Sequence, residues 1–147
     1  MMPLSETEVI ALCQSYTGDT VFALADAIVN MNIPLSLDIL KRISSVGRVD
    51  EWISWLIGSL RNILYIQSLR SFGVSESEIA TLIQAHPYVL KKWYRVGISL
   101  PALREIYQEL IMSNIAYKKG EWMKENELWR ILAIELALLG LQKYKNK

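Results

Sequence analysis

Residues 75–93 read SESEIATLIQAHPYVLKKW, and this stretch predicts two short helices joined by a tight break. Ser75 and Glu78 are three residues apart, a spacing at which each side chain can bind the other's free backbone amide at a helix start. Proline disfavours helical geometry in the residue before it and suits the first turn of a helix, so Pro87 should begin the second helix. Two helices joined this closely indicate either a helical hairpin or a helix-turn-helix.

The second of these helices has an apolar side and a basic side. Apolar residues recur along it at helical spacing, and the opposite side carries three cations. These cations are Lys91, Lys92 and Arg95. They could bind the phosphates of DNA, or they could form a solvated helix face. A DNA-reading helix needs polar side chains near its start, whereas this one begins Pro-Tyr-Val-Leu, so packing explains its residues better than base recognition does.

The rest of the chain also reads as helix. Apolar runs at helical spacing are separated by clusters of Gly, Pro, Asn and Asp, and strands are hard to place anywhere. Besides the two helices above, helices are expected over about 4–14, 21–31, 35–46, 50–72, 99–117 and 128–141. The segment SYTGDT at 15–20 should end the first, and 50–72 should be the central strut. The predicted fold class is all-α, a compact array of about eight helices.

Composition is that of one soluble globular domain. The chain has 147 residues, 52% of them hydrophobic, and a net charge of +1, so the whole molecule has no strong attraction for nucleic acid. The charge is uneven, because residues 1–80 carry five basic and nine acidic groups whereas residues 81–147 carry eleven and six.

The cysteine count and the first residues together predict the cellular compartment of the protein. A single cysteine, Cys13, leaves no internal disulfide and fits a reducing compartment. The start, MMPLSETE, has no signal-peptide pattern, so we expect a cytoplasmic protein. The apolar segment 128–141 carries Arg130 and Glu135 and is shorter than the roughly 20 residues that span a bilayer, so no membrane association is expected.

Catalytic motifs are absent from the sequence. It has no phosphate-binding glycine loop and no HExxH motif, and the single His86 and Cys13 are far apart in the chain. We therefore expect no catalytic residue, no metal and no cofactor.

The segment KKGEWMK at 118–124 is a charged loop around one large aromatic residue. Its DNA-contact candidates are Lys118, Lys119, Trp122 and Lys124. Stacking on an unpaired base tolerates any base, and flanking lysines can hold the phosphate backbone. The alternative is that Trp122 folds back to cover the core.

Four segments together resemble the C-terminal part of the delta subunit of bacterial DNA polymerase III, a clamp-loader component. They are VFALADAI at 21–28, RNILYIQSLRSFGVSESEIA at 61–80, HPYVLKKW at 86–93 and NIAYKKGEWMKENELWRILAIEL at 114–136. Their order and spacing agree from about Leu4 to the end of the chain. HPYVLKKW is the most specific of them.

The resemblance implies a non-catalytic collar domain. In this family the collar is all-helical and joins the loader subunits into a ring of five, which places the sliding clamp on primed DNA during replication. Residues 1–18 would be the end of the preceding lid domain, and 19–147 the collar and oligomerisation domain. A nucleotide-binding-like domain, which binds and opens the clamp, would precede Met1. The delta subunit lacks ATPase activity and is a component of the DNA polymerase III holoenzyme.

The implied partners are the other loader subunits, gamma or tau and delta prime. The sliding clamp would be bound only through the missing N-terminal domain, and primed DNA through the loop at 118–124. Collar domains associate through broad helical faces, so surplus aromatic residues are interface candidates. These are Trp52, Trp55, Trp93 and Tyr94. A helix-turn-helix DNA-binding module remains the alternative function, and a helical enzyme of another kind is a third.

Overall fold

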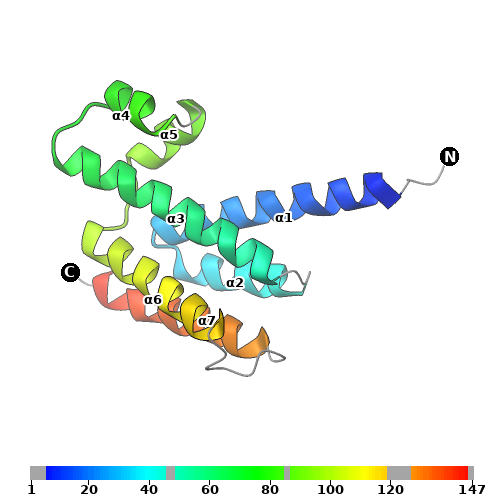
Figure 1. Ribbon diagram of the computed structural model, residues 1–147. Coiled ribbons are helices and arrows are strands. Elements are labelled where there is room, and N and C mark those ends of the chain that lie inside the picture. The colour runs from blue at the N-terminus through cyan, green and yellow to red at the C-terminus, as the bar shows by residue number, and fades with distance from the viewer. Residues whose placement is uncertain (1–5, 46–48, 85–86, 119–126, 146–147) are drawn as a thin grey trace.

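The structure is a computed structural model that describes residues 6–45, 49–84, 87–118 and 127–145 (Figure 1). These residues form seven α-helices and a final 3₁₀-helix, with no strand among them. The helices are α1 (Glu6–Val29), α2 (Ile33–Ser44), α3 (Val49–Ser71), α4 (Glu76–Ile83), α5 (Pro87–Tyr94), α6 (Leu100–Lys118) and α7 (Glu127–Gly140), followed by η1 (Leu141–Tyr144). The predicted all-α class is confirmed.

Helix α3 is the centre of the array, as its apolar composition predicts. It packs against α1 on one flank and α6 on the other, while α4 and α5 pack at its C-terminal end (Figure 1). Helix α7 lies against α6 and α2. The buried side of α3 supplies much of the core, with Trp52, Leu56, Leu60, Ile63 and Ile66 all fully buried.

The expected break at 15–20 is absent, and this is a correction to the predicted helix count. Helix α1 runs without interruption through Gly18 to Val29, so one helix replaces two. A glycine inside a helix costs only about 1 kcal/mol relative to alanine. The burial of Leu24 and Ile28 further along α1 outweighs that cost. The N-terminal turns of α1 project beyond the other helices (Figure 1).

The pair α4 and α5 forms as the opening stretch predicts. The Ser75 hydroxyl accepts a hydrogen bond from the Glu78 backbone amide at 3.3 Å, and α5 begins at Pro87. Gln84 ends α4 in the left-handed conformation, with φ of 52°. The two helices contact each other and α3, and α5 buries Leu90 and Trp93.

A buried arginine joins three helices at the opposite end of α3. Arg130 of α7 donates hydrogen bonds to the carboxylate of Asp50 on α3 at 2.5 Å and to the amide oxygen of Asn114 on α6 at 2.7 Å. Its buried charge is therefore paired, as a buried guanidinium requires. Within the described ranges, no helix is long and apolar enough to cross a membrane.

Candidate interaction surface

Of the three cations predicted for the basic side of α5, two are exposed and one is partly buried, with 34% of its side chain exposed. Lys91 and Arg95 are exposed. Lys92 instead turns toward α1, where its Nζ lies 3.7 Å from the Asp26 carboxylate and 4.9 Å from the centre of the Phe22 ring. Its ion pair and cation–π contact hold α5 against α1, so Lys92 is a weaker candidate for phosphate binding than its two neighbours.

The C-terminal end of α5 is held by side chains of α3. Gln67 donates hydrogen bonds to the backbone carbonyls of Trp93 at 2.7 Å and Tyr94 at 3.1 Å. Arg70 donates to the Tyr94 carbonyl at 2.9 Å, and its guanidinium lies 5.2 Å from the Tyr94 ring centre. These bonds satisfy carbonyls that a helix end leaves without intrahelical partners. Arg70 is therefore engaged within this chain.

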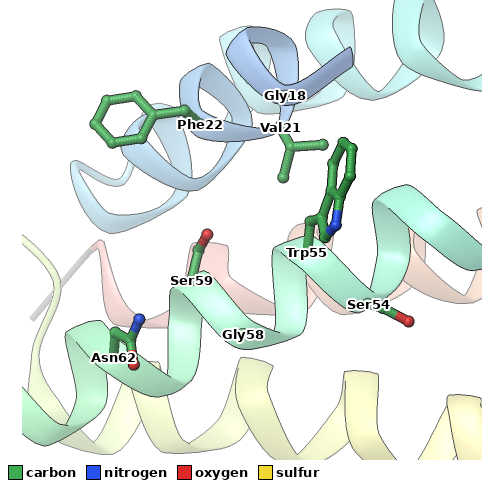
Figure 2. Close-up of a pocket in the computed structure, with 8 residues that line it drawn as sticks. All are labelled: Gly18, Val21, Phe22, Ser54, Trp55, Gly58, Ser59 and Asn62. Atoms are coloured by element: carbon green, nitrogen blue, oxygen red, sulfur yellow. The ribbon is translucent and has the colours of Figure 1, made fainter. Parts of the chain in front are cut away.

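A groove of about 480 Å³ runs between α1 and α3. It is lined by Gly18, Val21, Phe22, Ser54, Trp55, Gly58, Ser59 and Asn62. Figure 2 shows Trp55 rising from α3 beside Val21 of α1. Added Cβ atoms at Gly18 and Gly58 would meet nothing within 4 Å, so the glycines leave open space in the groove. The groove can accept apolar side chains and allows a close approach of another backbone.

Three large aromatic side chains are exposed along the outer side of α3 and just after its end. Trp55 is 38% exposed, Tyr65 53% and Phe72 85%. At 100° per residue, these positions fall within about 100° around the helix axis, together with Gly58 and Asn62. We call the set Trp55, Gly58, Asn62, Tyr65 and Phe72 the aromatic strip. Arg61 borders it and is also exposed.

The four residues predicted to contact neighbouring subunits differ in burial. Trp52 is 0% exposed and Trp93 is 4% exposed, so their side chains pack inside this chain and offer no contact surface. Tyr94 is half-buried under Arg70. Of these four residues, only Trp55 exposes a substantial part of its side chain to solvent. The sequence reasoning missed Tyr65 and Phe72, whose seven-residue spacing along the predicted helix 50–72 was the available signal.

Most of the predicted DNA-contact loop falls outside the described residues. Lys118 is the last residue of α6, whereas Lys119, Trp122 and Lys124 lie outside the described residues. Their proposed role therefore remains a prediction from sequence.

One further polar cluster joins the end of the chain to α6. Lys143 Nζ lies 2.6 Å from Glu105 Oε1. This hydrogen bond lowers the pKa of Glu105 and raises that of Lys143, while burial raises the pKa of Tyr144. The cluster fastens η1 to α6. In the part of the chain that the structure describes, no group of three or more His, Cys, Asp or Glu side chains could hold a metal ion.

Comparison with known proteins agrees with this arrangement. The family described as "DNA polymerase III delta subunit, C-terminal domain" matches residues 18–140. The fold is similar to that of the Bacillus subtilis DNA clamp loader delta protein, with a TM-score of 0.67 and 24% sequence identity. That match covers 86% of this chain but only 37% of the Bacillus subtilis protein. No curated protein matches the chain.

Proposed function

Because this chain belongs to the family formed by the C-terminal domains of DNA polymerase III delta subunits, we propose that it is a collar that joins the subunits of a clamp loader. In this role it performs no catalysis itself. It assembles with gamma or tau and delta prime subunits into the five-membered ring that places the sliding clamp on primed DNA. The family match over residues 18–140 is the observation that carries this proposal.

The surface of the domain supports an assembly role. A soluble monomer seldom exposes large apolar side chains in a row, and such rows usually mark contacts with other proteins. The aromatic strip is a row of this kind on the central helix. Its neighbour, the groove between α1 and α3, adds a concave element to the same surface.

The continuous helix α1 has a physical consequence for the proposed division of the chain into a lid domain and a collar domain. If residues 1–18 are the end of a lid domain and 19–147 the collar, a continuous helix crosses the boundary. A helix resists bending far more than a loop does, so the two domains would be joined rigidly. The sliding clamp would be bound by the domain that precedes the lid, and primed DNA by the loop that contains Trp122.

The contacts of α5 do not favour the helix-turn-helix alternative. Its apolar side is buried against α3, its C-terminal carbonyls are bonded to Gln67 and Arg70, and Lys92 is paired with Asp26. Two exposed cations, Lys91 and Arg95, remain for phosphate contacts, which is few for a specific DNA-binding helix.

Reconstitution tests the proposal directly. The purified chain is mixed with gamma or tau and delta prime subunits and examined by gel filtration, with each component alone as a control. We expect the chain to elute early, together with the other subunits. Separate elution at all concentrations tested would contradict the collar role, and salt-sensitive, sequence-selective duplex binding by the chain alone would favour the alternative.

A further inference from the structure

We propose that the aromatic strip of α3, with the adjoining groove, is the docking site for an amphipathic helix of another clamp-loader subunit. The partner helix places apolar side chains in the groove and a carboxylate opposite Arg61. This inference rests on the proposed function, and it names the surface and the partner chemistry that the assembly uses.

The size and shape of the strip fit a helix laid along it. Trp55 and Phe72 are 17 positions apart, which corresponds to about 25 Å along a helix axis. The exposed parts of the three aromatic side chains amount to roughly 400 Å². Aromatic side chains of this kind commonly anchor protein interfaces.

The groove supplies the place where the partner's side chains enter. Val21 and Trp55 form apolar walls, and Gly18 and Gly58 leave room between them. Ser59 and Asn62 also line the groove and can bond to polar atoms of the partner. A leucine or methionine on the partner helix has the length to enter such a groove while its backbone lies over the glycines.

The charge of this surface selects an acidic partner. From Trp52 to Ser71, α3 contains no Asp or Glu, and its only charged residues are Arg61 and Arg70. Arg70 is engaged with Tyr94, whereas Arg61 is exposed at the border of the strip. A carboxylate on the partner helix would complement Arg61, favour one orientation and raise the rate of association.

A second copy of this chain fits the strip less well. A two-fold dimer places the same surface on both sides, so each Arg61 would face a strip that has no carboxylate. The exposed aromatic area of the strip, roughly 400 Å², is also only about half of what a stable interface buries on each partner. A contact of this size is suited to one joint within a larger assembly.

The test uses the full chain and the reconstituted loader. The variants are Tyr65→Ser with Phe72→Ser in one chain, Arg61→Glu in a second, and Leu136→Ser as the matched control. Leu136 is 69% exposed on α7, away from the strip. The melting temperature of each variant is measured first, because these exposed positions should tolerate substitution.

We expect the two strip variants to weaken assembly by at least about 10-fold and the control by less than about 2-fold. If the unmodified chain assembles and the strip variants assemble equally well, this inference is wrong and the proposed function stands. If the unmodified chain does not assemble, both fail. If strip variants abolish binding of a primed oligonucleotide but not assembly, the strip binds DNA and the inference is overturned. A homodimer that the strip variants disrupt would overturn it as well.

Discussion

Phe22 of α1 stacks on Trp93 of α5, with ring centres 5.2 Å apart and ring planes 25° from parallel. Lys92 lies over the same Phe22 ring. The contact joins segments that are far apart in the chain, and it holds the α4–α5 pair to the body of the domain. Phe22 also lines the groove, so one residue belongs both to this joint and to the candidate surface.

Removing Trp93 should therefore loosen the α4–α5 pair. We expect Trp93→Ala to lower the free energy of unfolding by about 3–5 kcal/mol, because it leaves a large cavity against Phe22. Urea denaturation followed by circular dichroism measures the change. Leu136→Ala is the control, and a cost near zero should be seen there because Leu136 is exposed. A similar small cost for Trp93→Ala would mean that α5 is not held by this stack.

Arg130 should be the most costly charged residue to remove. We expect Arg130→Ala to destabilise the domain by about 3–5 kcal/mol, because the loss of this large buried side chain leaves a cavity and the Asn114 amide oxygen loses its donor. Asp50→Ala should cost less, about 2 kcal/mol, since Arg130 keeps its bond to Asn114. Equilibrium denaturation of the two variants shows which one loses more free energy of unfolding. The reverse order would show that the ion pair, rather than the buried arginine, stabilises this end of the domain.

Two glycine substitutions should shift stability in opposite directions. Gly58 lies inside α3 and a Cβ there meets no atom within 4 Å, so Gly58→Ala should stabilise the domain by about 1 kcal/mol. Gly73 has φ of +82°, a conformation that alanine adopts with strain, so Gly73→Ala should destabilise it by about 1–2 kcal/mol. Thermal melts under identical conditions compare them. If both variants shifted the melting temperature equally and in the same direction, the backbone geometry described for Gly73 would be contradicted.

The Glu105–Lys143 pair should contribute to stability only at intermediate pH. The pKa of Glu105 is lowered in the folded protein from its usual 4.5, so its contribution is present above that value and is lost as pH falls below it. The pKa of Lys143 is raised from 10.5, so its contribution is lost as pH rises above that value.

The stability difference between the unmodified chain and Lys143→Met measures this contribution. We expect a small, constant difference between about pH 5 and pH 10 that vanishes at lower and higher pH. The pair is exposed, so added salt should shrink the difference. A difference that persists after the pH is low enough to protonate the Glu105 carboxylate would mean that the packing of the Lys143 side chain, and not its charge, is responsible.

Trp122→Ala separates the two roles open to this residue. If Trp122 stacks on an unpaired base, the assembled loader should bind primed DNA about 10-fold more weakly while the melting temperature of the domain stays unchanged. Fluorescence anisotropy with a labelled primed oligonucleotide measures the affinity, and Lys91→Ala tests the alternative basic face in parallel. A large fall in melting temperature would instead make Trp122 a core residue.

The local features of the fold could be read from the sequence because they depend on neighbouring residues. The Ser75 cap needs only Glu78 three positions on, and the start of α5 needs only Pro87. Apolar spacing was enough to predict an all-α array with α3 at its centre. The break expected at 15–20 failed because the weak helix propensity of Gly18 is a small energy beside the burial that follows it.

The tertiary structure alone decided which of the similar side chains face outward. Trp52 and Trp55 lie three positions apart on one helix, and only the packing of α1 and α6 around α3 buries the first and exposes the second. Lys91 and Lys92 are adjacent, yet Asp26 and Phe22 of α1 engage only Lys92. The sequence by itself thus determined the all-α class and the family. The surface available to a partner was decided by contacts between residues far apart in the chain, which local spacing does not encode.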